Sequence, residues 1–146
     1  MAEEVGRQHF LCWVHGRPAP QGSKTAYVIG GRAVMKEASK FLPAWRSAVT
    51  EAAVVEMNRS MDVRPFKTPV RLSAEFYIER PKNPKYKAFP GGKPDTDHLI
   101  RSVGDSLTKA GILLDDALIC EIHAKKLWVG ADTYPESGAK VEIWAL

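Results

Sequence analysis

The chain has 146 residues, of which 45% are hydrophobic and 26% charged, so its composition excludes wholesale disorder and fits one globular domain over 1–146. No apolar run approaches the roughly 20 residues that span a bilayer. The acidic start of the chain lacks the basic and apolar regions of a secretory signal, so we expect a cytoplasmic protein. Residues 1–8 are expected to be flexible.

The net charge of +4 is unevenly distributed along the chain. Residues 1–94 hold 16 Lys and Arg against 8 Asp and Glu, whereas residues 95–146 hold 5 against 9. This asymmetry favours a surface that binds a polyanion around a local acidic pocket. No membrane partner is expected, because the chain has no membrane-spanning apolar run. Chance and ordinary solvated faces are the alternative explanation.

The first half of the chain predicts a strand, a hairpin and a helix. His9–His15 is strand-like, and a loop rich in Gly and Pro follows over 16–24. The segments 26–29 and 32–35, joined by two glycines, predict a hairpin with a two-residue loop. A helix is expected over 39–57, where apolar residues recur at helical spacing: Leu42, Trp45, Val49, Ala52 and Ala53.

A strand, a loop and a second helix follow. Residues 70–79 alternate apolar and polar side chains, which predicts a strand with one buried face. The basic stretch 80–93 contains several Pro and Gly, so we expect a mobile surface loop. Binding to a nucleic-acid backbone and simple solvation are equally open for this loop. A helix is then predicted from residues 95–97 to Lys109, with Gly111 as its C-cap.

Two more strands are expected, over 117–127 and 140–145. In the first, alternation places Cys120 on one face with Leu118, Ile122 and Ala124. Cys12 and Cys120 lie inside predicted strands without metal-ligand spacing, so both are expected to be buried, reduced thiols. The element order predicts an α/β (α+β) fold, with a single-domain mixed β-sheet and two main helices.

Four acids frame the second predicted helix. Asp95 and Asp97 lie at its start, and Asp115 and Asp116 follow it after a short turn. The role of an N-cap, which stabilises a helix by roughly 0.5–2 kcal/mol, would be enough to explain a single Asp at this start. Close carboxylates repel each other unless a cation joins them, and Mg²⁺ binds through carboxylates while leaving positions open for a phosphate. We therefore favour a metal site over simple helix capping.

Arg101 is the cation closest in sequence to these acids. It lies one turn beyond Asp97 and could stabilise the charge that develops on a phosphate in phosphodiester hydrolysis. The alternative is an i,i+4 ion pair with Asp97 or Asp105, which stabilises by only about 0.3–0.5 kcal/mol when exposed. The glycine pairs lack the patterns of nucleotide-binding loops, so no nucleotide cofactor is expected.

The segments 95–101, 105–111 and 114–117 together resemble the signature of the RusA family of Holliday junction resolvases, the crossover junction endodeoxyribonucleases. That signature has an Asp-x-Asp-Asn-Leu-x-Lys segment, an Asp-x-Leu later in the same helix, and an Asp-Asp pair before the next strand. The loop 16–24 is also similar to the basic, Pro-rich loop after the family's first strand.

The resemblance implies a homodimeric, Mg²⁺-dependent endonuclease that nicks opposite strands of a four-way DNA junction. Asp95, Asp97 and Asp116 match the family's metal-binding catalytic acids. Arg101 stands where the family has a functional lysine, and His98 replaces the usual Asn. Arginine keeps the charge but is a poor proton donor.

We therefore expect a RusA-like, structure-selective endonuclease of DNA recombination and repair that uses Mg²⁺, for which Mn²⁺ could substitute. Asp105 and Asp115 would be supporting acids, and the residues expected to contact DNA are Lys24, Arg46, Lys93 and Arg101. The resemblance also implies a bacterial host cell and an origin in a phage or prophage. The alternatives are a non-catalytic junction-binding protein on the same fold and a structural protein whose acids only cap a helix.

Overall fold

The computed structural model describes residues 8–22, 25–36, 39–60, 63–130 and 136–146. Its elements, in chain order, are β1 (His9–His15), β2 (Thr25–Ile29), β3 (Arg32–Lys36), α1 (Leu42–Arg59), β4 (Val70–Ile78), α2 (Thr96–Ala110), the 3₁₀ turn η2 (Asp116–Leu118), β5 (Ile119–Trp128) and β6 (Gly138–Ala145). Every predicted helix and strand in the described residues is present.

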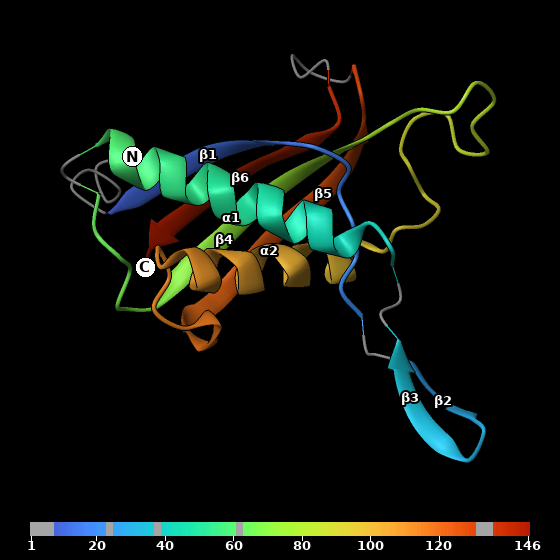
Figure 1. The fold of residues 1–146 in the computed structure, drawn as a ribbon. Coiled ribbons are helices and arrows are strands. Elements are labelled where there is room, and N and C mark those ends of the chain that lie inside the picture. Colours follow the sequence, from blue (N-terminus) through green and yellow to red (C-terminus); the bar gives the residue numbers. More distant parts are fainter. Residues whose placement is uncertain (1–7, 23–24, 37–38, 61–62, 131–135) are drawn as a thin grey trace.

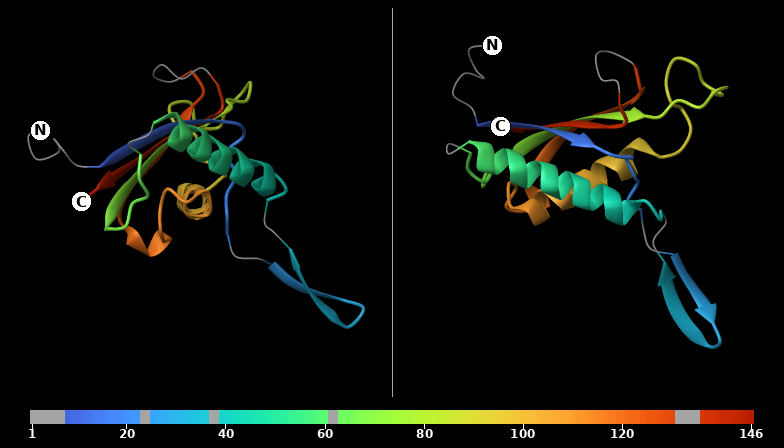
Figure 2. Two further views of the ribbon diagram at one scale, coloured as in Figure 1. Left: turned by 60° about the vertical axis from the view of Figure 1, so that its left-hand side comes forward. Right: turned by 45° about the horizontal axis from the view of Figure 1, so that its top comes forward.

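One mixed sheet forms the body of the protein. Its strand order is β1-β6-β4-β5, in which β4 and β5 are parallel and the other neighbours are antiparallel. Both helices cover the same face of this sheet (Figure 2). The hairpin β2–β3 is a separate two-stranded sheet that projects from the body (Figure 1). The structure thus confirms the predicted α+β fold with a mixed sheet and two main helices.

The core lies between the sheet and the two helices. Alternate residues of β1, β4 and β6 face it, which is the period of two that the sequence shows. Burial of one such large apolar side chain stabilises the fold by about 1.5–3 kcal/mol. The strand residues of this core are Phe10, Cys12, Val14, Val70, Leu72, Ala74, Phe76, Ala139, Val141 and Ile143.

The helices supply the other half of the core. Trp45 of α1 is buried, as predicted, and so is the apolar stripe of α2, which consists of Leu99, Ile100, Val103 and Leu107. Helix α1 begins at Leu42, three residues later than predicted, because Pro43 is accommodated only in the first turn of a helix. Among the described residues, no helix is both long and apolar enough to cross a membrane.

The C-cap of α2 forms as predicted. Gly111 adopts the left-handed conformation with φ +89°, and its N–H donates to the carbonyls of Leu107 and Thr108. A residue with a Cβ is strained in this conformation, which is why glycine commonly ends a helix.

The prediction that Cys120 is buried is wrong. Val70 of β4 pairs with Ile119 and Arg71 pairs with Glu121, so Cys120 is the extra residue of a bulge on an edge strand, where it is exposed. The bulge also breaks the predicted alternation, and the side chain of Ile122 is left 54% exposed. Cys12 is buried as predicted.

A buried hydrogen bond joins the helices and gives a test of this packing. The indole Nε1 of Trp45 donates to Ser102 Oγ at 3.1 Å, and Ser102 is fully buried. Ser102→Ala leaves the indole N–H without an acceptor, so we expect a loss of about 1–3 kcal/mol in the free energy of unfolding. The melting temperature in differential scanning calorimetry should fall by about 3–10 °C.

The matched control is Ser106→Ala. Ser106 is equally buried on the same helix, but its hydroxyl only donates to the carbonyl of Ser102 at 2.7 Å. Removal of that hydroxyl leaves no donor unsatisfied, so the melting temperature should change much less. Equal losses in the two variants would show that the Trp45–Ser102 bond does not join the helices.

Candidate active site

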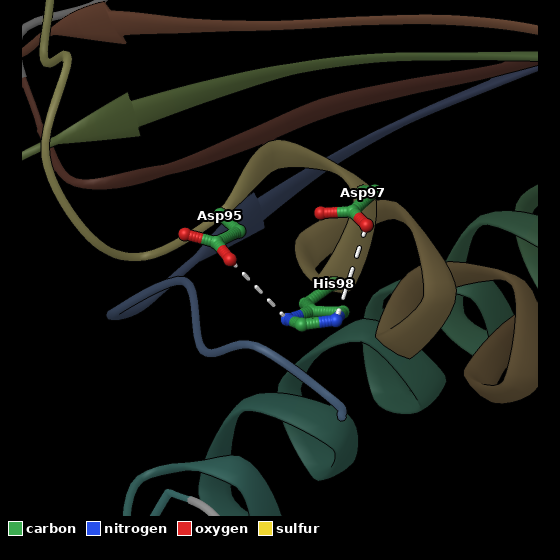
Figure 3. Close-up of side chains that lie close together, drawn as sticks. All are labelled: Asp95, Asp97 and His98. Carbon is green, nitrogen blue, oxygen red and sulfur yellow. Dashed lines mark ion pairs between the residues drawn. The ribbon is translucent and has the colours of Figure 1, made fainter. Parts of the chain in front are cut away.

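Asp95, Asp97 and His98 form a cluster at the start of α2 (Figure 3). One ligand atom from each of these residues lies within 4.8 Å of the others. The His98 ring lies between the two carboxylates, with Nδ1 3.7 Å from Asp95 Oδ2 and Nε2 3.9 Å from Asp97 Oδ2. The side chain of Asp97 is 81% exposed, so its oxygens are open to solvent. Carboxylate oxygens in an open position fit Mg²⁺ or Mn²⁺, which keep water or phosphate as further ligands.

The local structure leaves the Asp95 carboxylate free of a capping role. Asp95 is the N-cap residue of α2 and has an extended backbone, but its side chain makes no cap hydrogen bond. Asp97 lies in the first turn, where its charge complements the helix dipole. The helix-capping explanation of these acids therefore accounts for the charge of Asp97 but not for the position of Asp95.

The other acids form a second group. Asp105, two turns beyond Asp97 on α2, interacts with Asp116, and Asp115 caps η2 by accepting a 2.8 Å hydrogen bond from the Ala117 N–H. Side-chain hydrogen bonding with Asp105, then some desolvation of this exposed group, then hydrogen bonding with Asp115 raise the pKa of the Asp116 carboxyl, and the charges of both neighbours add to this. Within the described residues, Asp116 is not a member of the Asp95–Asp97–His98 cluster.

The four residues predicted to contact DNA are placed differently. Lys93 lies next to Asp95 in a shared hollow, whereas Arg46 lines another hollow beside Lys109 of α2. Arg101 is exposed, and in the part of the chain that the structure describes it forms no ion pair with Asp97 or Asp105. Lys24 lies outside the described residues.

An open hollow of about 540 Å³ adjoins the cluster. Besides Asp95 and His98, it is lined by three cations, namely Arg17, Lys40 and Lys93. Sequence reasoning did not single out Arg17 or Lys40, although Arg17 belongs to the loop 16–24 that resembles the family's basic loop. The hollow therefore combines carboxylates with positive charge that could attract a phosphate.

The same loop also contacts the second acidic group. The Gln21 side-chain amide donates to Asp105 Oδ2, and the Gln21 backbone N–H donates to the carbonyl of His98 at 2.9 Å. Gln21 thus links the start of α2 to the acid two turns further along. Sequence reasoning missed this residue, because only the fold brings it to α2.

Lys126 is a further residue that the sequence did not reveal. Its Nζ donates to the carbonyls of Gly92 at 2.6 Å and Pro94 at 2.8 Å, directly before Asp95. Burial lowers the pKa of Lys126, whereas the charge of Asp95 opposes that effect. The sequence did contain one signal for this residue. Lys126 lies two residues beyond Ala124, so both are on the face of β5 that turns toward the helices.

The loop 80–93 is attached to β5 at a second point. The indole Nε1 of Trp128 donates to the carbonyl of Tyr86 at 3.2 Å. The loop therefore has defined contacts at both its middle and its end. Its predicted mobility stays a prediction.

We expect Lys126→Met to loosen this loop. Hydrogen bonds to a charged group contribute about 1.5–3 kcal/mol when shielded from water, and Lys126 is only partly buried. Limited proteolysis with trypsin, followed by mass spectrometry, should therefore show cleavage after Lys85 and Lys87 that is about tenfold faster. The control is Lys125→Met, which removes the neighbouring cation that faces Glu75 at 3.8 Å instead. Equal cleavage rates in the two variants would contradict the anchoring role of Lys126.

Sequence comparison relates the chain to a known protein family. No curated protein matches the chain. The family model described as endodeoxyribonuclease RusA matches residues 15–143, which include both acidic groups, Arg101 and Lys126. The match covers most of the sequence and confirms the resemblance seen in the acidic motifs. The chain therefore belongs to the RusA family of endodeoxyribonucleases.

Proposed function

We propose that this protein is a Mg²⁺-dependent, structure-selective endonuclease that resolves four-way DNA junctions by paired nicks in recombination and repair. Family membership makes the chain a Holliday junction resolvase that acts on branched DNA. The observation that carries the finer proposal is the exposed cluster of Asp95, Asp97 and His98 beside a hollow lined by cations.

The proposal assigns a role to each group of residues. Asp95 and Asp97 would hold the ion together with Asp116, and Asp105 and Asp115 would support them. When bound, Mg²⁺ polarises a phosphoryl oxygen and lowers the pKa of an attacking water.

The cations would act on the substrate. Arg101 stabilises the charge that develops on the phosphate, and its lack of an ion pair with the helix acids supports this role. Lys93 binds the DNA backbone beside Asp95, and Lys24 and Arg46 bind it further away. Mn²⁺ could replace Mg²⁺, because both ions prefer carboxylate and water ligands.

The proposed assembly is a homodimer. A four-way junction must be cut on two opposing strands, and a twofold-symmetric pair of chains places one site on each strand. The products would carry 5′-phosphate and 3′-hydroxyl ends. The proposed setting is the cytoplasm of a bacterial host, with a phage or prophage as the source.

Asp97→Asn tests the reaction and the site together. Loss of one charged ligand should lower the rate of Mg²⁺-dependent nicking of a labelled synthetic four-way junction by at least ~100-fold. The wild type should make paired nicks in the junction and leave a linear duplex of the same sequence intact. Rates are compared at saturating protein, so that weaker binding does not mimic slower chemistry.

Glu51→Gln is the matched control, because Glu51 is also an exposed helix carboxylate but lies on α1. Its nicking rate should equal that of the wild type. Tight junction binding by the wild type without nicking in Mg²⁺ or Mn²⁺ would favour a non-catalytic junction-binding protein instead. An Asp97→Asn variant as active as the wild type would remove Asp97 from the site.

Asp116→Asn should separate stability from activity. The pKa of Asp116 in the folded state is raised, so the contribution of this group to stability is present below its unfolded pKa of about 4 and is lost as the pH rises through the folded value. At pH 7 in a chelator, the variant should therefore melt about 1–2 °C higher, a small gain because solvent screens this exposed group. Nicking in Mg²⁺ should fall at least ~100-fold.

The pH series supplies the control for this variant. At pH 4 and below, Asp116 is increasingly protonated, so the two melting temperatures should converge. A variant that melts lower than the wild type at pH 7 would show that the Asp116 carboxylate stabilises the fold without a metal.

A further inference from the structure

A second hollow, of about 440 Å³, lies beside the acidic cluster. This volume falls within the range of small-molecule sites in proteins. Its lining combines two aromatic side chains and several prolines with cations, and includes Tyr86, Trp128, Pro84, Pro90, Arg17 and Lys85. Flat apolar walls with positive charge suit a flat, anionic ligand such as a nucleotide.

The wall that carries Tyr86 is built by close contacts. A Cβ added to Gly91 would lie 2.9 Å from Tyr86 Cδ2, so only glycine allows this approach. The carbonyl of Tyr86 accepts the hydrogen bond from Trp128, and Lys126 holds the carbonyl of Gly92. The backbone of the loop 80–93 is thus bonded to β5 at two points, which support the aromatic lining. Tyr86 is still 48% exposed, and Lys85 Nζ lies 5.5 Å from the centroid of its ring, so a base stacked on the exposed part of the ring would also meet this cation.

The second hollow adjoins the hollow at the acids. Both are lined by Arg17, Pro18, Lys93 and Pro94, and the next residue is Asp95. A nucleotide whose phosphate lies at Asp95 could therefore place a neighbouring base in the second hollow. Arg17 and Lys93 would face the backbone that joins the two positions.

We infer that the second hollow is a subsite for one unpaired nucleobase next to the scissile phosphate, stacked on Tyr86. Paired bases inside a duplex are stacked on each other and cannot enter such a hollow, whereas a base at a branch point is displaced at the smallest cost. The subsite would thus contribute to the selection of branched over linear DNA. This inference rests on the proposed function and assigns a base-binding role to residues outside the acidic motifs.

Junctions that lack one base test the inference. Each position beside the branch point is replaced in turn by an abasic nucleotide, and binding in chelator and single-turnover nicking in Mg²⁺ are measured for each. In the wild type, one abasic position should weaken binding or nicking by ~5- to 150-fold, the effect of losing one base–aromatic stack. Tyr86→Ala should show a similar loss on the intact junction and no further loss at that abasic position.

Two variants serve as controls. Tyr86→Phe keeps the ring and should behave as the wild type does. Phe89→Ala removes a 60% exposed aromatic side chain from the same loop that does not line the hollow, so it should also be unaffected. Circular dichroism and melting temperature check that Tyr86→Ala is folded, which is expected because only the backbone of Tyr86 bonds to Trp128.

The outcomes separate this inference from the proposed function. Non-additive losses for Tyr86→Ala and one abasic position would support the subsite. If the wild type nicks the intact junction but the two losses multiply independently, or if no abasic position matters, the subsite is overturned and the proposed function stands. If the wild type binds without nicking, the proposed chemistry fails while the binding data still decide the subsite. If it neither binds nor nicks, both are overturned.

Discussion

The packing of α2 against both the sheet and α1 fixes the direction of every charged group on this helix. Its buried stripe and Ser102 face the core, where the Trp45 indole holds the serine hydroxyl at 3.1 Å. Since a helix has 3.6 residues per turn, Asp97, Arg101 and Asp105 then follow one another along a different side. A rotation of α2 that moved these residues would break the Trp45 hydrogen bond and expose apolar surface. The packing of the core therefore also fixes the orientation of this row of charges.

The gathering of acids on one side of α2 opposes folding, and the surrounding chain offsets part of that cost. Asp105 accepts a hydrogen bond from Gln21, and Lys126 places a positive charge near Asp95 while it binds the adjacent carbonyls. The pKa of the Asp116 carboxyl is raised mainly by its hydrogen bond with Asp105, and the charges of Asp105 and Asp115 add to this as residual repulsion. Residual repulsion of this kind is common where stability is traded for activity, and a bound cation would remove it.

The sequence predicted the features that depend on local patterns. The period of α2, its Gly111 cap and the alternation of β4 gave the correct elements, and the acidic motifs gave the family. The sequence did not predict the features that depend on contacts between residues far apart in the chain. The bulge at Cys120 appears only in the pairing of the edge strand β5 with β4, at the shift between Val70 and Arg71. Lys126 binds carbonyls 32 and 34 residues away, a contact that no local period encodes.

Charges that are separated along the sequence are interleaved in space. Arg17, Lys40 and Lys93 come from the basic part of the chain, yet they line one hollow with Asp95 and His98. A DNA phosphate is attracted by the three cations and repelled by the Asp95 carboxylate until a metal cation neutralises that carboxylate. On the proposed function, metal and DNA must then strengthen each other's binding, because a coupling free energy between two sites is reciprocal. On this proposal, the three cations would bind the DNA backbone without a metal. Only a bound metal would make it favourable for the scissile phosphate to lie over the acids.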